Sequence, residues 1–330
     1  MAIAAVAAAG GVYYRYHRQA PVAAPKRSFL IVAVSPGGAA YGKFFAGFQE
    51  AIAEINRVND AEISLVFKNA EGDSQKLKEL ISEAVVMKPD IIATISSPPT
   101  AQALKETKET QIPILTALGD PVEHGYIKSL QSSGTNLAGI AQQNIELTPK
   151  RFEILKELVP AAKKVAVFYD TTCGATKKAR PIANAAAPAL GLALTEFPLT
   201  NPTSDETAGA LEAVSGKDFD ALIFYPHGTL FSKSDLFLKK AAEEKLSIIM
   251  PDEESLAGGA LASYGPSYFE MGKALGKMAE KILIGGARPE DVPFEQPNKI
   301  EFIVNLTAAR KLGISLPEAV LKRADRVVEY

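Results

Sequence analysis

The amino-acid sequence predicts an α/β protein made of two doubly wound parallel sheets that follow one another along the chain. Three observations lead to this fold class. The chain has 330 residues, which at ~100 to 200 residues per domain indicates two compact units. From Ser28 onward, short apolar runs alternate with longer segments of helical period, the pattern of βαβ units. That pattern begins again after Thr148-Pro149, where a proline suits the first turn of a helix.

The first unit is expected to contain four strands with a helix between each strand and the next. The strands are short apolar runs, and the helices carry apolar residues at helical spacing. Strands are predicted near Phe29–Val34, Ser64–Phe67, Ile91–Ile95 and Ile114–Thr116. Helices are predicted near Gly42–Arg57, Ser74–Met87 and Thr100–Thr110.

The second unit repeats this alternation after the helix that begins at Thr148-Pro149. Its strands are predicted near Val165–Tyr169, Ala193–Pro198, Ala221–Phe224 and Ser247–Ile249. Its further helices are predicted near Ala175–Ala189, Ser204–Val214 and Ser232–Glu244.

A tail follows the second unit and can contribute to both. It adds strands at Ala260–Ser263 and Glu301–Asn305, a long helix near Ser267–Ile284 and a short helix from Thr307. One helix that returns to the first lobe and one strand that joins the second would link the lobes by three crossovers; an ordinary C-terminal extension is the alternative. We therefore expect lobe 1 to comprise residues 28–142 and 265–288, and lobe 2 residues 143–264 and 289–330.

Composition and charge narrow the function before any motif is considered. Lys and Arg number 36 against 38 Asp and Glu, without the basic surplus that is typical of nucleic-acid binders. One cysteine and three histidines are too few for a disulfide within the chain or for a Cys- or His-based metal site. We therefore predict no cofactor, no metal and no nucleic-acid partner.

Residues 1–27 differ from the rest and are predicted to be a signal or anchor remnant and a linker. Met1–Val12 is apolar, too short to span a membrane but suited to the core of a signal peptide. Basic residues follow this run rather than precede it, so three interpretations stay open: a signal or anchor that starts upstream, an atypical anchor, or an Ala-rich tail. We favour the first. No cysteine follows the run as an acceptor for a bacterial lipid.

Ligands of open parallel sheets bind beyond the carboxyl ends of the strands, which directs attention to the loops there. These loops are rich in hydroxyls, small residues and tyrosine, and they expose backbone N–H groups at helix N-termini, which suit an anion. In the first lobe they are Ser35–Tyr41, Asn69–Ser74, Ser96–Thr100 and Ala117–Pro121; in the second, Asp170–Gly174, Tyr225–Thr229 and Pro251–Ser255.

Two of these loops admit a catalytic interpretation, and each has a simpler alternative. Ser35-Pro36-Gly37-Gly38 resembles a phosphate loop but lacks both G-x-G-x-x-G and G-x-x-x-x-G-K-[ST], which favours a turn that brings backbone close to a ligand. Cys173 precedes a helix, where a thiol can be activated, yet only His124 and His227 could serve as its base. His227 either lines a pocket or is a partly exposed loop residue.

The acidic residues of these loops also have simpler roles. Asp73, next to Ser74, is a good helix N-cap, although it could contact a ligand. Asp120 precedes Pro121 and either forms a turn or reaches the cleft. No loop combines the nucleophile, base and orienting residue of an enzyme, so we predict that the protein is not an enzyme.

Four segments of the chain carry a family resemblance. They are Ile303–Pro317 (IVNLTAARKLGISLP), continuing to Glu329, together with Asn69–Asp73 (NAEGD), Gly119–Val122 (GDPV) and Gly259–Tyr268 (GALASYGPSY). These segments resemble one group of ABC-transporter substrate-binding proteins, the group that includes tryptophan- and tyrosine-binding lipoproteins, and the first is similar to the C-terminal signature of that group. The resemblance extends in order from Ser28 to Glu329 and is specific to the family, not to its ligand.

This resemblance implies the type I periplasmic-binding-protein fold, a Venus-flytrap of two lobes with a three-crossover hinge that closes on one small molecule. Carried over by position, it implies ligand contacts from loops of both lobes. Together with Tyr41 of the first loop, the predicted ligand-binding residues are Ser35, Ser96, Ser97, Asp120, Asp170, Thr171, Thr172, Tyr225, His227 and Asp252.

The chain departs from the resembled group at two of these loops. Amino-acid binders of the group tend to carry acidic and Asn residues after the first strand of the second lobe and an Asp-Asn pair two strands later. This chain has Asp170-Thr171-Thr172-Cys173-Gly174 and His227-Gly228 instead. We therefore expect an amino acid or a less polar organic solute, and the tyrosines suit a flat or apolar body.

The function that the resemblance implies is extracytoplasmic solute capture by hinge closure for delivery to an ABC permease. The protein is expected to be monomeric and periplasmic, or anchored to the membrane and facing the periplasm. The alternative is a ligand-sensing receptor of the same fold that signals to a membrane partner. An enzyme on this scaffold is the least favoured.

Overall fold

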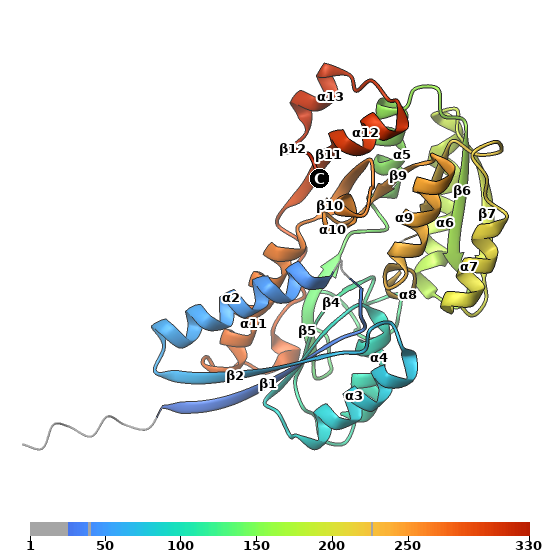
Figure 1. Cartoon of the computed structure of the whole chain (residues 1–330). Coiled ribbons are helices and arrows are strands. Elements are labelled where there is room, and N and C mark those ends of the chain that lie inside the picture. Colours follow the sequence, from blue (N-terminus) through green and yellow to red (C-terminus); the bar gives the residue numbers. More distant parts are fainter. Residues whose placement is uncertain (1–25, 39–40, 226) are drawn as a thin grey trace, which may run out of the picture.

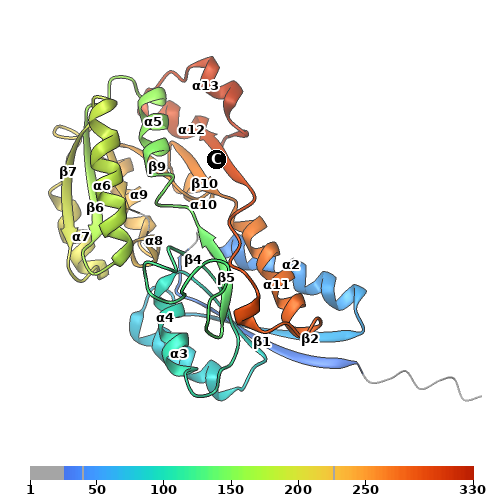
Figure 2. The ribbon, with the colours of Figure 1, turned by 180° about the vertical axis from the view of Figure 1, so that it is seen from behind.

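The two predicted sheets form two halves of the molecule, which we name the first lobe (sheet β1–β5) and the second lobe (sheet β6–β12). The computed structural model describes residues 26–38, 41–225 and 227–330. Figures 1 and 2 show the lobes one above the other, with helices on both faces of each sheet. The predicted fold class, α/β with two doubly wound sheets, is therefore confirmed.

The first lobe has a fully parallel sheet of five strands in the order β2-β1-β3-β4-β5. The strands are β1 (Arg27–Ser35), β2 (Ala61–Asn69), β3 (Ile91–Ile95), β4 (Ile114–Gly119) and β5 (Leu137–Gln142). The helices are α2 (Gly42–Val58), α3 (Ser74–Val86), α4 (Ser97–Glu106) and, from the tail, α11 (Tyr268–Leu283).

The alternation of side chains along β1 explains how both faces of this sheet are covered. Ile31 and Ala33 pack in the core that contains α2 and α11, whereas Val32 and Val34 pack in the core that contains α3 and α4. Strand β3 is buried along its whole length. A continuous apolar run of this kind is typical of a parallel strand that helices cover on both sides.

The second lobe has seven strands in the order β12-β11-β10-β9-β8-β6-β7, in which only the β10–β11 pair is antiparallel. The strands are β6 (Lys164–Asp170), β7 (Ala193–Leu199), β8 (Ala221–Phe224), β9 (Ser247–Met250), β10 (Ala262–Pro266), β11 (Ile300–Asn305) and β12 (Arg326–Val328). The helices are α5 (Thr148–Leu158), α6 (Gly174–Ala189), α7 (Ser204–Glu212), α8 (Gly228–Phe231), α9 (Ser234–Glu244), α10 (Glu254–Ala257), α12 (Leu306–Leu312) and α13 (Glu318–Arg323).

Helix α11 leaves the second lobe and packs along α2 of the first (Figure 1). A Cβ atom on Gly272 would lie 1.9 Å from the carbonyl oxygen of Phe44, and one on Gly47 would lie 2.1 Å from that of Phe269. The two helix backbones are therefore in direct contact, and only glycine fits between them. This contact fixes the returning chain to the first lobe.

The chain crosses between the lobes after β5, between β10 and α11, and before β11 (Figure 2). The last crossing differs from the predicted boundary at residue 288. Glu295 donates its N–H to the carbonyl oxygen of Gly139 (3.0 Å) and accepts from the N–H of Ala141 (2.8 Å). The short helix η2 (Pro289–Asp291) and Glu295 thus lie along the edge strand β5, because this segment satisfies its otherwise unpaired backbone groups.

Strand β5 is absent from the predicted elements for a physical reason. Its run contains Gly139, at which a Cβ atom would lie 1.9 Å from the carbonyl oxygen of Thr116. Glycine and alanine have low strand propensity. The close packing of β5 on β4 requires small residues, and those residues make β5 hard to recognise as a strand from the sequence. The short elements α8, α10, α13 and β12 were likewise not predicted. Helix α4 begins at Ser97, three residues before its predicted start, because Pro98 and Pro99 are tolerated in a first turn.

Replacing Gly272 by alanine should destabilise the protein by roughly 2–3 kcal/mol, because the added methyl group forces α2 and α11 apart. Urea unfolding measures the change. Gly209→Ala is the matched control, since Gly209 lies in the exposed middle of α7 with no heavy atom within 4 Å of its added Cβ. The control should be neutral or stabilising by up to ~1 kcal/mol. Equal midpoints for Gly272→Ala and the native chain would contradict the backbone contact.

Candidate functional site

The lobes touch one another across the carboxyl ends of their strands. At the start of α8, a Cβ atom on Gly228 would lie 2.7 Å from both side-chain atoms of Ser96, which precedes α4. A Cβ atom on Gly38 would lie 3.2 Å from the Cα of Ser232. Between these contacts the ring of Tyr41 lies 6.2 Å from that of Phe231. Contacts this close between residues of different lobes indicate that the two lobes are closed on one another.

This closed interface leaves a small cavity of ≈ 30 Å³ between the lobes, room for one or two water molecules in the closed form. Side chains of both lobes and of the first hinge crossing line it. The lining residues are Tyr41, Ser96, Ser97, Gly119, His124, Gln142, Asn144, Ile145, His227, Gly228 and Phe231.

The first-lobe wall is built on the sharp turn from β3 into α4. Ser96 is 6% exposed, has a left-handed φ of 73°, and its Oγ has no hydrogen-bond partner among the described residues. Ser97 Oγ lies 3.0 Å from Nε2 of His124, whose ring stacks on Tyr126 with centroids 5.1 Å apart. Burial and the nearby His227 lower the pKa of His124 below its ordinary value. Strained, unpartnered groups of this kind concentrate at ligand sites.

The hinge wall is held by a buried arginine. Arg151 donates to the carbonyl oxygen of Asn144 (2.6 Å) and to its Oδ1 (3.1 Å), and also to the carbonyl oxygen of Tyr264 (2.8 Å). Asn144 Nδ2 in turn donates to Gln142 Oε1 and to the hydroxyl of Tyr268, at 3.3 Å each. These bonds fix the first crossing to the second, so the amides that face the cavity are held in place.

The second-lobe wall contains a buried ion pair. His227 Nδ1 lies 3.2 Å from Oδ2 of Asp170, and Oδ1 of Asp170 accepts from the N–H (2.8 Å) and the Oγ1 (2.6 Å) of Thr172. Burial alone would lower the pKa of His227, but pairing with Asp170 and a bond to Cys173 raise it to about 9. Despite burial, His227 and Thr172 hold the pKa of Asp170 below its usual value. At neutral pH the pair is an imidazolium beside a carboxylate.

Four of the predicted site residues line the cavity, namely Tyr41, Ser96, Ser97 and His227, and Asp170 lies directly behind His227. The loop interpretation of Ser35-Pro36-Gly37-Gly38 agrees with its geometry, since Ser35 Oγ accepts from the N–H of Gly37 (3.2 Å) and does not reach the cavity. Asp73 caps α3 by accepting from two backbone N–H groups, as predicted.

Five further predicted residues do not line the cavity. Thr171 and Thr172 are exposed at the end of β6. Tyr225 is 1% exposed and stacks on Tyr169 inside the second lobe, with centroids 6.0 Å apart. Asp252 is 1% exposed and is held by the N–H (3.0 Å) and Oγ of Ser255. Asp120 instead pairs with Lys178 across the lobes at 2.9 Å, next to Gly119 of the cavity.

The predicted site residues did not include those of the hinge wall or the aromatic ring of Phe231 in the second lobe. Gln142, Asn144 and Ile145 lie on a crossing between lobes rather than on a loop that leads from a strand into a helix of the same lobe. Phe231 lies at the end of α8, a one-turn helix that the pattern did not reveal. The only available signal was their position just after the predicted end of the first unit.

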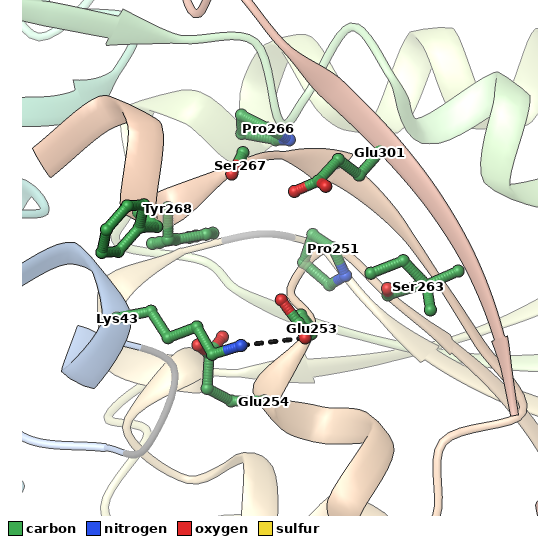
Figure 3. A pocket seen from close by; sticks show the side chains of 12 residues that line it. Lys43, Pro251, Glu253, Glu254, Ser263, Pro266, Ser267, Tyr268 and Glu301 are labelled. Atoms are coloured by element: carbon green, nitrogen blue, oxygen red, sulfur yellow. Dashed lines mark ion pairs between the residues drawn. The ribbon is translucent and has the colours of Figure 1, made fainter. Parts of the chain in front are cut away.

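A second small hollow of ≈ 20 Å³ lies at the hinge, between α2, α10 and strands β10 and β11 (Figure 3). There Lys43 of the first lobe pairs with Glu253 of the second at 2.8 Å. Glu254 lies beside them with both carboxyl oxygens buried and without a hydrogen-bond partner in the described part of the chain. Burial and the charge of Asp252 raise the pKa of Glu254 to about 8, so it is largely protonated at neutral pH.

The family assignment rests on nearly the whole length of the chain. The sequence profile of the ABC transporter substrate binding protein family matches residues 31–328. The chain belongs to this family. The Tyrosine-binding protein of Clostridioides difficile (strain R20291) is 32% identical over 269 residues, which are 81% of this chain and 76% of that protein.

Solved structures of similar proteins agree with this assignment. An ABC domain in complex with L-Trp from Streptococcus pneumonia has a TM-score of 0.79 at 25% sequence identity. The match covers 91% of this substrate-binding protein and 100% of the chain of that structure. A ligand-free, open substrate-binding protein from Clostridium difficile has a TM-score of 0.61 at 27% identity, covering 91% and 99%. The ligand-bound structure is the more similar in shape although not in sequence, which agrees with the closed lobes seen here.

Membership of this family makes the chain a solute-binding protein of ABC transport, and the comparisons do not favour the ligand-sensing alternative. The family consists of extracytoplasmic solute-binding proteins rather than enzymes. None of the helices in the described residues is long and apolar enough to cross a membrane. The predicted signal segment Met1–Val12 lies outside the described residues.

Gly228→Val should hinder closure of this substrate-binding protein, because its side chain would collide with Ser96 and with Pro98, whose Cδ lies 3.2 Å from an added Cβ. We expect a larger radius of gyration by X-ray scattering and at least tenfold weaker ligand binding, with thermal unfolding little changed. Gly174→Ala is the control, since its Cβ would make an ordinary 3.8 Å contact with His124 Nδ1. Scattering identical to the native protein would contradict the closed interface.

Glu254→Gln should flatten the pH dependence of stability between pH 5 and 8. The folded state holds the Glu254 proton up to about pH 8, whereas the unfolded chain releases it near 4.5, so the free energy of unfolding falls as pH rises through this window. The substitution should therefore stabilise the protein at pH 8 by roughly 2–4 kcal/mol and change little at pH 5. Denaturation at both pH values measures this, with the 80% exposed Glu318→Gln as the control. The same pH slope in both variants would argue against a buried, protonated Glu254.

Proposed function

We propose that the interlobe cavity binds one small organic carboxylic acid, a class that includes the amino acids in the names of the relatives, and that closure presents it to a permease. The observation that carries this proposal is the 6% exposed hydroxyl of Ser96, which lines the cavity at the start of α4 and has only the Tyr41 hydroxyl beside it. Buried polar groups without partners are rare in native proteins.

The start of α4 suits a carboxylate in particular. The backbone N–H groups of a first helical turn lack partners within the helix, and the positive end of the helix dipole favours an anion. Pro98 and Pro99 carry no N–H, so among the first three residues of α4 only Ser97 supplies a backbone donor. The Ser96 and Ser97 hydroxyls add side-chain donors beside it. A carboxylate bound there would satisfy these groups together.

The rest of the cavity suits an apolar or flat body. The rings of Tyr41 and Phe231 face one another from opposite lobes, and Ile145 lies on the hinge wall. A ligand body between these side chains would contact both lobes at once. It would therefore bind the closed form more tightly than the open form, as population shift requires.

We further propose that the protein acts on the periplasmic side of the membrane, as a monomer, with an ABC permease as its partner. The family supports an extracytoplasmic location and a transporter partner. A permease that binds the closed lobes would distinguish loaded from empty protein, because the interlobe contacts of Gly228 and Gly38 exist only when the lobes meet.

Ser97→Trp should abolish binding, since the indole would fill the cavity at the carboxylate position. Calorimetry of the purified full chain against a panel of aromatic and aliphatic carboxylic acids and amino acids measures affinity, and scattering measures compaction. Ser64→Trp, on the exposed face of edge strand β2, is the control and should bind as the native protein does. If no member of the panel binds or compacts the native protein, the proposal is wrong.

A further inference from the structure

Within that proposed function, on which this inference rests, we propose that the bound acid carries no ammonium group beside its carboxylate, and that His227 sets this preference. The ligand would be an aryl- or alkyl-substituted carboxylate of amino-acid size rather than a zwitterion. Three features of the cavity lead to this assignment: which residues line it, what its acceptor atoms already bind, and how His227 pairs with Asp170.

The described lining residues offer no anionic partner for an ammonium group. Among the eleven of them there is neither Asp nor Glu, while two are histidines and three carry hydroxyls. An ammonium group brings three N–H donors and a positive charge, and burying it without a charged or well-placed acceptor is strongly unfavourable. The cavity is therefore matched to an anion or a neutral group.

The amide oxygens on the hinge wall are already in use. Asn144 Oδ1 accepts from Arg151 at 3.1 Å, and Gln142 Oε1 accepts from Asn144 Nδ2 at 3.3 Å. Because Arg151 is itself buried and holds this arrangement through three acceptors, turning the Asn144 amide toward a ligand would leave a buried guanidinium N–H unpaired. Each of these oxygens thus keeps at most one lone pair for an ammonium group, and neither carries a negative charge.

Asp170 is the carboxylate that could have received an ammonium group, and His227 neutralises it. Asp170 is 2% exposed; one of its oxygens accepts from Thr172, and the other lies 3.2 Å from Nδ1 of His227. His227 stands between Asp170 and the cavity, since it lines the cavity and Asp170 does not. A ligand therefore meets the cation of this pair, and the imidazolium favours a carboxylate.

A second buried cation increases the positive charge on this side of the cleft. Lys233 is 8% exposed, and its Nζ contacts the Thr229 carbonyl oxygen (3.2 Å) and Ser232 Oγ (3.4 Å). No ion pair joins it to a carboxylate within the described residues. Burial lowers the pKa of Lys233, and the charge of Asp170 opposes that shift.

Asp120 is the other carboxylate that could receive a ligand ammonium group, because its Oδ2 is buried and has no described hydrogen-bond partner. Its other oxygen pairs with Lys178 at 2.9 Å, and Asp120 does not line the cavity. An ammonium group could reach Asp120 past Gly119, the neighbouring residue that lines the cavity.

Matched ligand pairs test the preference directly in the native protein. The probes are 3-(4-hydroxyphenyl)propanoate against L-tyrosine, 3-(indol-3-yl)propanoate against L-tryptophan and 4-methylpentanoate against L-leucine, each titrated calorimetrically into the full chain at pH 7. In the pair that binds best, we expect the acid without the amino group to bind at least tenfold more tightly.

Two substitutions at one position separate charge from shape. His227→Asn keeps a polar group near Asp170 but removes the positive charge, so the preference for the deamino acid should fall at least tenfold. His227→Lys retains the charge and should retain the preference. Thermal unfolding of both variants establishes that they fold, and the ratio of the two affinities within a pair cancels any general loss of binding.

Each outcome bears on the assignment. A deamino preference that is lost in His227→Asn and kept in His227→Lys supports it. Equal or tighter binding of the amino acid by the native protein overturns it and leaves the proposed function intact, with Asp120 as the position that would then hold the ammonium group. An unchanged preference in His227→Asn overturns the role of His227. Failure of every probe to bind overturns this inference together with the proposed function.

Discussion

The packing of α11 on α2 is the constraint on which the remainder of the molecule depends. Only Ser267 separates helix α11 from the second lobe's β10, yet glycines bring the backbone of α11 against that of α2. The chain must then cross back to place β11 beside β10 in an antiparallel pair. Three crossings follow from this one contact, and they limit the relative motion of the lobes to a hinge whose wall also forms part of the cavity.

The second consequence is that two of the contacts between the lobes involve glycine. Gly228 against Ser96 and Gly38 against Ser232 leave no room for an added side chain at these positions. A contact of this kind is either made or not made, which gives the protein two distinct states instead of a continuous range. The side chains that can vary, among them His227 and Phe231, are thereby left to determine the ligand.

The sequence was sufficient for the fold because both lobes repeat one local pattern, and it was sufficient for those site residues that follow a βα junction, such as Ser96, Ser97 and His227. It failed where the decisive contact is non-local. Gln142 and Asn144 belong to the site only because Arg151 and Tyr268 hold the first crossing against the second. Tyr225 also follows a strand, but the alternation of side chains along β8 turns its ring into the lobe. A shift of one residue reverses the side to which each side chain points, and the sequence of so short a strand does not determine which alternative holds.

The charges at the hinge explain why closure should depend on ligand. In the closed form Glu254 is buried without a partner, and Asp252, whose pKa burial raises to about 6, lies close enough to add to its pKa shift. Glu254 favours hydrated surroundings over burial without a partner, whereas the Lys43–Glu253 and Lys178–Asp120 pairs across the lobes favour closure. Exposed ion pairs contribute little, on the order of 0–1 kcal/mol each. The unpaired carboxyl of Glu254 therefore opposes closure of the empty protein, and the contacts that a ligand adds to both walls favour it.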